Sequence, residues 1–220
     1  KDQEGRGGGG GGSNTRDDDA LWRDLSTAFS FKGLTLIPDL LSPSLESELL
    51  FEIDNAGWAA SQSGRLKQEY GPKVNFKEQT IRVTASYATL PAWTLPLLRA
   101  VEGSSHPSLD GFLAVEFGAL DYGPLRGAAI APHIDDSWLW GPRIVTFSLL
   151  SPVTMGFIRG DLEVRVRLPP RSALVMAGPA RYQWLHAIRR QDVTSRRISL
   201  TFRELSAEFR PGGGRAEEGL

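Results

Sequence analysis

The stretch Pro132–Asp136 holds the residues with the clearest potential for chemistry, because His133 and Asp135 lie two positions apart. Side chains two apart in an extended strand point to the same face, so one strand can direct an imidazole and a carboxylate at one point. His186, much further along the chain, offers a second imidazole. Two histidines and one carboxylate with open positions form the usual site of a non-haem Fe(II) oxygenase. These residue types therefore suggest a metal site built from His133, Asp135 and His186.

Simpler explanations of these residues stay open at this point. A His-x-Asp triplet is short enough to occur by chance, and a buried histidine can equally be a hydrogen-bonded core residue. Asp136 is an alternative carboxylate, although in a strand it would face the opposite side from His133. The third histidine, His106, lies in the turn-like sequence Ser104–Pro107, so we expect it at the surface.

A second polar signal lies near the C-terminus, where alternate positions of a predicted strand carry Arg197, Ser199, Thr201 and Arg203. If this row points into the fold, its two guanidinium groups need anionic partners. A small dicarboxylate would supply them, because arginine binds carboxylates in a bidentate manner. The alternative is an exposed basic edge strand, which charged residues protect from aggregation. The intervening apolar residues, 198, 200 and 202, are expected to pack against helices.

The elements that must position these groups can be read from the sequence pattern. Ser42 and Pro43 start a predicted helix that ends near Ala56, and a second helix is predicted between Pro91 and Gly103. Residues 34–37 form a short predicted strand. From Phe112 on, short apolar runs separated by turn residues predict the strands 112–118, 128–135, 143–150, 153–158, 162–168, 172–177 and 195–204. We therefore expect a mainly β (α+β) fold, a double-stranded β-helix (jelly roll) buttressed by N-terminal helices.

Bulk composition limits the function classes. A length of 220 residues with 40% hydrophobic side chains suits one domain, and a net charge of −1 gives no strong global attraction for nucleic acid. The absence of cysteine excludes disulfides and cysteine-based zinc sites. No apolar run approaches the length of a membrane span, so we expect no membrane partner.

Three segments lie outside the regular pattern. Residues 1–18, with the glycine run 7–12, are expected to be a disordered linker, and residues 210–220 a disordered tail. Residues 60–80 interleave basic, polar and aromatic side chains. This segment is either a solvated β-hairpin with Gly71-Pro72 as its turn or a loop that contacts a substrate.

Several motifs go beyond pattern and resemble one family. They are Gly33–Asp39, Ser61–Arg65, Tyr70–Phe76, Pro132–Asp136, Trp138–Gly141, Trp184–Ile188 and Thr201–Phe209. With these motifs, residues 32–209 resemble the AlkB family of Fe(II)- and 2-oxoglutarate-dependent dioxygenases, in particular the branch of its fourth homologue. The resemblance implies a catalytic domain over residues 19–209.

The resemblance also implies roles for individual residues. It implies that His133, Asp135 and His186 hold Fe(II), and that Arg197, Arg203 and Tyr122 bind the cosubstrate 2-oxoglutarate. The family usually has an asparagine just before this tyrosine, whereas the residues that precede it here, Gly118–Asp121, include none. Residues 60–80 would be the substrate-recognition hairpin. The implied substrate contacts are Arg65, Tyr70, Lys73, Asn75, Phe76, Trp138 and Trp140.

The implied reaction couples two oxidations. O2 converts 2-oxoglutarate to succinate and CO2, and an N-methyl group is hydroxylated and lost as formaldehyde. The substrate implied is monomethyl-lysine in a protein, actin being the protein associated with this branch, in the cytoplasm and nucleus. The alternatives are N6-methyladenine in DNA or RNA and, in a different class, a non-catalytic jelly-roll binding module.

Overall fold

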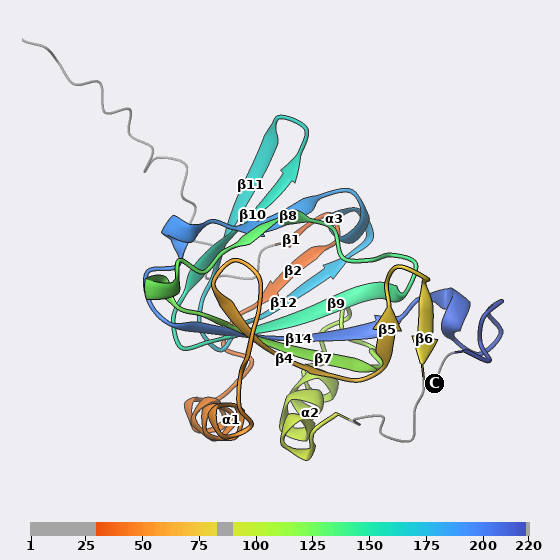
Figure 1. Ribbon diagram of the computed structural model, residues 1–220, viewed down its shortest axis with the longest axis horizontal. Coiled ribbons are helices and arrows are strands. Elements are labelled where there is room, and N and C mark those ends of the chain that lie inside the picture. The colour runs from red at the N-terminus through yellow and green to blue at the C-terminus, as the bar shows by residue number, and fades with distance from the viewer. Residues whose placement is uncertain (1–29, 83–89, 219–220) are drawn as a thin grey trace, which may run out of the picture.

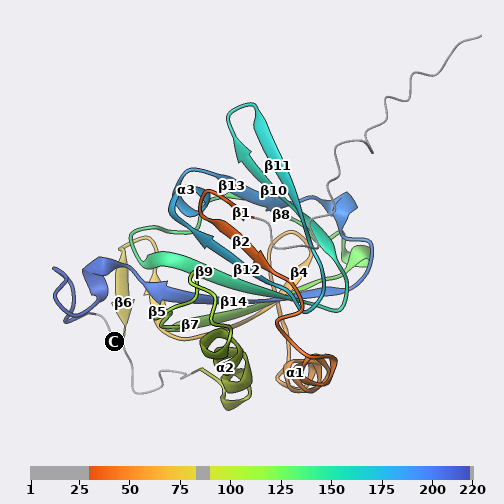
Figure 2. The same cartoon turned by 180° about the vertical axis from the view of Figure 1, so that it is seen from behind.

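Two facing β-sheets form the body of the protein, and two helices support the larger sheet (Figure 1). The computed structural model describes residues 30–82 and 90–218. Both helices lie on the face of the larger sheet that points away from the smaller sheet, as the reverse view also shows (Figure 2). The mainly β jelly-roll architecture with buttressing helices is thus confirmed.

The larger sheet has eight strands in the order β1-β2-β12-β9-β14-β7-β4-β3. Its neighbouring strands pair antiparallel. The strands are β1 (Ser30–Phe31), β2 (Leu34–Ile37), β3 (Ala59–Ala60), β4 (Arg65–Tyr70), β7 (Glu116–Tyr122), β9 (Trp140–Leu149), β12 (Ala173–Ala177) and β14 (Arg197–Leu205).

The smaller sheet has four antiparallel strands in the order β11-β10-β13-β8, and a separate pair, β5-β6, lies beside the larger sheet. The strands are β5 (Lys73–Asn75), β6 (Thr80–Arg82), β8 (Ile130–His133), β10 (Val153–Arg159), β11 (Leu162–Leu168) and β13 (Leu185–Ile188). The predicted strand 162–168 matches β11 residue for residue.

The helices begin as the sequence predicts. In α1 (Pro43–Asn55), the Ser42 hydroxyl accepts a hydrogen bond from the Leu45 backbone N–H at 3.1 Å, which satisfies one free donor of the first turn. A short 3₁₀ turn, Ala92–Thr94, leads into α2 (Leu95–Gly103). The third helix, α3 (Gly178–Tyr182), was not predicted, and its five residues are too few to show a helical period.

The apolar core has two main parts, one on each face of the larger sheet. Ile198, Leu200 and Phe202 of β14 pack with Leu49 of α1 and Leu97 of α2, as the alternation of β14 predicts. The second part fills the space between the sheets and includes residues of β9, β10 and β12. The apolar face of β14 therefore fixes its polar face toward the interior between the sheets.

Two predicted strand boundaries are wrong. The predicted strand 112–118 lies instead at 116–122, because hydrogen-bonded turns occupy the residues before it, with Phe112 N–H bonded to the Leu109 carbonyl. The predicted strand 128–135 is shorter, and β8 ends at His133. Beyond that point the backbone carbonyls of Asp135 and Asp136 bond to an arginine side chain in place of a neighbouring strand.

The prediction of a single hairpin over residues 60–80 is also wrong. Its first part is β4, which joins the larger sheet beside β7, and its second part pairs with β6 as the β5-β6 hairpin. Gly71 connects the two parts with a φ of 118°. Because β4 continues a sheet, alternate side chains on it face opposite sides: Gln68 bonds toward α1, whereas Lys67 faces the interior between the sheets.

The C-terminal residues differ from the expected disordered tail. Residues 210–218 form turns, and the Arg215 guanidinium lies 4.5 Å from the Phe209 ring centroid and donates to the Gln79 carbonyl. The expected linker 1–18 lies outside the described residues. No helix within 30–82 and 90–218 has the length and apolarity to cross a membrane.

Candidate functional site

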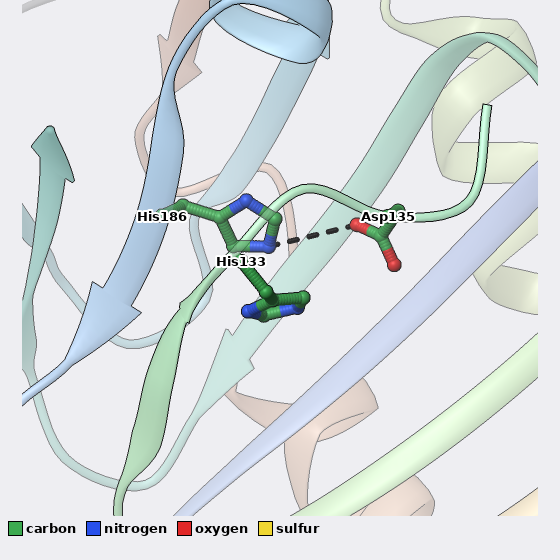
Figure 3. Close-up of side chains that lie close together, drawn as sticks. All are labelled: His133, Asp135 and His186. Carbon is green, nitrogen blue, oxygen red and sulfur yellow. Dashed lines mark ion pairs between the residues drawn. The ribbon is translucent and has the colours of Figure 1, made fainter. Parts of the chain in front are cut away.

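The three predicted metal ligands lie together between the sheets (Figure 3). His133 at the end of β8 is the register partner of His186 in β13, and their ring centroids are 4.2 Å apart. The Asp135 carboxylate oxygen Oδ2 lies 3.5 Å from His186 Nε2. One donor atom from each residue lies within 4.8 Å of the other two. Sequence reasoning thus selected three residues that the fold brings together.

Asp135 reaches this cluster by a different route from the one predicted. It follows β8 and does not share a strand with His133. Arg181 of α3 fixes this loop: it is 2% exposed, and it donates to the carbonyls of Asp135 at 2.9 Å and Asp136 at 3.2 Å. Sequence reasoning missed Arg181, because its partners are backbone atoms of a distant segment and leave no local pattern.

The protonation states of the ligands suit a metal. His133 Nδ1 lies 2.9 Å from the Ala131 carbonyl, which can only accept, so Nδ1 donates to it and Nε2 is the nitrogen that faces a metal. Burial lowers the pKa of His186 to about 4, so its imidazole is neutral at physiological pH. Burial raises the pKa of Asp135, but Arg203 and the two histidines outweigh burial and hold it well below its usual range.

Arg203 of β14 links two carboxylates. It donates to Asp135 Oδ1 at 2.8 Å and to Glu116 Oε2 at 2.7 Å. Burial lowers its pKa, but these two partners raise it further, so the guanidinium is charged. Arg203 therefore orients Asp135 and leaves the carboxylate oxygen Oδ2 directed at His186.

Arg197, at the other end of the polar row, lacks an anionic partner among the described residues. It is 1% exposed, its Nη2 donates to Ser148 Oγ at 3.0 Å, and its guanidinium lies 5.0 Å from the Tyr122 ring centroid. Its Nε and Nη1 atoms have no hydrogen-bond partner. Burial lowers its pKa. A buried arginine with free donors needs an anion.

A cavity of about 50 Å³ connects Arg197 to the three ligands. Thr201 and Ser199 of the same strand also line it. A small dicarboxylate fits these chemical features, with one end at Arg197 and the other at the metal. The His-Asp-His donors likewise fit Fe(II). The residues present are therefore suited to both groups.

A wider cavity of about 580 Å³ opens beside His133. Its wall includes Arg65 of β4, one of the predicted substrate contacts, together with Glu116 and Arg203. Phe76, 53% exposed, packs on Trp138 with ring centroids 6.5 Å apart, and neither residue lines this cavity.

The remaining predicted substrate contacts have other surroundings. The Tyr70 ring packs on Trp93 and Phe117 on the helix side of the larger sheet. Trp140 is 5% exposed and belongs to a small apolar cluster with Leu205. Lys73 is exposed, and Asn75 Oδ1 accepts from backbone N–H groups of its own turn. Aromatic type alone did not distinguish packing residues from cavity residues.

Comparison with known proteins decides the family. Residues 84–203 match the family described as the 2OG-Fe(II) oxygenase superfamily. The chain belongs to this superfamily. It is 42% identical over 224 aligned residues to the human protein named alpha-ketoglutarate-dependent dioxygenase alkB homolog 4, covering 87% of this chain and 73% of that protein. The superfamily match and this identity make the chain an AlkB-type 2-oxoglutarate-dependent dioxygenase, whose cofactor set is Fe(II), 2-oxoglutarate and O2.

Two further proteins are similar to this dioxygenase. A Caenorhabditis elegans protein named DNA N6-methyl adenine demethylase is 39% identical over 183 residues, covering 82% of this chain and 62% of that protein. The solved structure of OsALKBH1 superimposes with a TM-score of 0.61 at 14% identity, over 81% of this chain and all of that one. The structural likeness shows a shared fold.

Proposed function

We propose that this dioxygenase oxidatively removes N-methyl groups, with monomethyl-lysine in a protein as its substrate and actin as a candidate protein. The observation that supports the proposal best is the position of the His133, Asp135 and His186 cluster. It lies where the smaller cavity leading to Arg197 meets the open cavity beside His133. The smaller cavity suits a dicarboxylate, and the open cavity suits an external substrate.

Each residue then has a defined task. His133, Asp135 and His186 would hold Fe(II), and Arg197 with Tyr122 would bind the carboxylate of 2-oxoglutarate that is distant from the metal. Fe(II) with 2-oxoglutarate and O2 supplies the oxidation of a C–H bond of the methyl group. Arg203 keeps Asp135 ionised and oriented. The apolar side chains between the sheets limit water around the reacting groups.

A second candidate substrate is N6-methyladenine in DNA or RNA. It is favoured by the 39% identity to a relative whose name states that activity. Arg65 in the open cavity also suits a phosphate. The net charge of −1 gives no general attraction to nucleic acid.

The test supplies both substrate classes to the same preparation. Purified protein with Fe(II), 2-oxoglutarate and O2 is incubated with actin peptides that carry monomethyl-lysine, and separately with oligonucleotides that carry N6-methyladenine. Mass spectrometry then reports the loss of a methyl group, and succinate is measured in parallel. We expect methyl loss from the peptide and formation of succinate.

The His133→Ala and Asp135→Ala variants serve as controls. They should fold, as circular dichroism would report, and should lose both products. Methyl loss from the oligonucleotide alone would overturn the lysine substrate in favour of the second candidate. Absence of succinate with every substrate would favour the non-catalytic binding module.

A further inference from the structure

The wall of the open cavity beside His133 contains a carboxylate that is not one of the three metal ligands. Glu116 is the first residue of β7 and the register partner of Arg203 in β14. Arg203 binds Glu116 with one nitrogen and Asp135 with the other. Glu116 therefore lies one guanidinium group away from a metal ligand, on the side where a substrate enters.

The two oxygens of Glu116 differ in their contacts. Oε2 accepts from Arg203, whereas Oε1 accepts no hydrogen bond from any described residue. Oε1 lies over Gly118, at 3.5 Å from the position that a Cβ would occupy there. Both residues line the open cavity. A larger side chain at 118 would cover this oxygen, so glycine keeps Oε1 accessible to a ligand.

The other charged groups of this wall have contacts of their own. Glu69, whose side chain is 65% exposed, binds Lys67 at 2.7 Å, and Arg65 donates through Nε to the Gln62 carbonyl. Glu116 Oε1 is thus a free acceptor next to Arg203, which binds the metal ligand Asp135. It would favour a ligand that brings an N–H donor, above all a cationic one.

The wall also lacks an aromatic side chain on which a flipped base could stack. None of the described residues lining the cavity is Phe, Tyr or Trp, and the one ring among them is the metal ligand His133. Enzymes that act on a base hold it by stacking on aromatic or apolar side chains. Aromatic cages also serve quaternary ammonium groups, which have no N–H. The wall has apolar side chains, Leu120 and Ile130, beside a free carboxylate, and this combination suits an aliphatic amine with an N–H better than it suits either group.

We propose that Glu116 Oε1 accepts a hydrogen bond from the ammonium group of a mono- or dimethylated aliphatic amine and so selects this substrate class. The inference rests on the proposed demethylase function and extends it to the recognition of the substrate. A trimethylated amine has no N–H to donate and is disfavoured. Bound in this way, the amine places its methyl group toward His133 and the metal.

The test is equilibrium binding without turnover. Protein loaded with Mn(II) and 2-oxoglutarate is titrated by calorimetry with Nα-acetyl-Nε-methyl-lysine amide and with its trimethyl counterpart. We expect wild type to prefer the monomethyl probe about tenfold, as the loss of one charge-assisted hydrogen bond predicts. Glu116→Gln should weaken binding of the monomethyl probe by about tenfold and remove the preference.

The matched control is Glu69→Gln, which removes the other carboxylate of the same wall and should leave both affinities unchanged. Binding of 2-oxoglutarate to Glu116→Gln should also be unchanged, since the amide oxygen still accepts from Arg203. If Glu116→Gln does not fold, Glu116→Asp takes its place. This variant shortens the side chain by one methylene, withdraws the oxygen, and should weaken binding of the monomethyl probe in the same way.

Unaltered monomethyl binding in a folded Glu116 variant would overturn the inference, as would equal wild-type affinity for both probes. Neither result affects the proposed function, which fails only if wild type removes no methyl group from lysine. If wild type removes methyl from lysine but Glu116→Gln binds the monomethyl probe normally, the proposed function stands and the role of Glu116 is refuted.

Discussion

The two arginines of β14 have different tasks, although the sequence presents them as equals. Arg203 is paired with Asp135 and Glu116, while Arg197 is buried with two free donor atoms. The difference follows from position: Arg203 lies beside the metal ligands, whereas Arg197 lies in the smaller cavity, away from Asp135 and Glu116. The unpaired charge of Arg197 therefore sets the preference for an acidic cosubstrate.

Replacing Arg197 by lysine tests this task. Lysine keeps the charge but loses the planar, bidentate geometry. We expect the KM for 2-oxoglutarate to rise roughly tenfold to a hundredfold, since a hydrogen bond between charged groups contributes about 1.5–3 kcal/mol. Steady-state succinate formation measures this change. An unchanged KM would mean that the cosubstrate carboxylate is bound elsewhere.

Arg181 is a positioning residue that acts through the backbone of the Asp135 loop. In Arg181→Met the carbonyls of Asp135 and Asp136 lose their donor, so the carboxylate should be less well oriented. We expect metal affinity to fall about tenfold to a hundredfold, the usual effect of losing such support. Titration with Fe(II) under anaerobic conditions measures it.

Two control variants accompany the Arg181 experiment. Arg181→Lys should restore part of the metal affinity, because an ammonium group can reach one of the carbonyls. Arg189→Gln, at an exposed arginine paired with Glu163, should have no effect. An Arg181→Met protein with wild-type metal affinity would leave Arg181 with a packing role alone.

At the scale of elements, β14 and α1 are connected by a charged network at the edge of the larger sheet. Arg196, which precedes β14, donates to both oxygens of Asp54 in α1, at 2.9 and 2.6 Å, and to Asp121 in β7 at 2.7 Å. Asp121 directly precedes Tyr122 but does not line the cosubstrate cavity, and its carboxylate binds Arg196 on the other face of the sheet. The network connects α1 to β7 and β14, the two strands of the larger sheet that carry Tyr122 and the two arginines.

Acid should weaken this connection in a defined direction. The hydrogen bond from Arg196 lowers the pKa of Asp54 from the ordinary value of 3.8. The ion pair of Asp54 with Arg196 therefore stabilises the fold above pH 3.8, and this stabilisation is lost as the pH falls through the lowered pKa. Asp54→Asn should cost about 0.2–1 kcal/mol at neutral pH, because the pair is partly exposed. Urea unfolding at neutral and acidic pH should show that this deficit disappears in acid.

If the loss of unfolding free energy in Asp54→Asn persists or grows in acid, the ion pair of Asp54 is not the source of the pH dependence. Glu102→Gln on α2, a carboxylate with no ion pair among the described residues, provides the control and should show no such dependence.

At the scale of the whole molecule, the site exists only where the two sheets face each other. The smaller sheet contributes both histidines through β8 and β13, and the larger sheet contributes both arginines through β14. The helices lie on the outer face and fix the inward direction of β14 by packing on its apolar residues. The alternation of polar and apolar residues along β14 therefore specifies both the fold and the site.

This organisation explains what the sequence can and cannot predict. The alternation in β14 is local, so both the arginine row and the packing face were predictable. The strand β13 was missed, because Leu185–Ile188 is too short for a period to appear. Arg181 and Glu116 were missed since their partners are distant in sequence. The packing of the aromatic residues Tyr70 and Trp140 could not be predicted, because residue type does not reveal which face of a strand is packed.

The most direct test of the central claim is a crystal structure of the protein grown without oxygen in the presence of Fe(II) and 2-oxoglutarate. The account predicts an anomalous signal from iron at coordination distance from His133, Asp135 and His186, with the distal carboxylate of 2-oxoglutarate on the free nitrogens of Arg197. Iron bound to other residues, or the acid bound away from Arg197, would contradict the account.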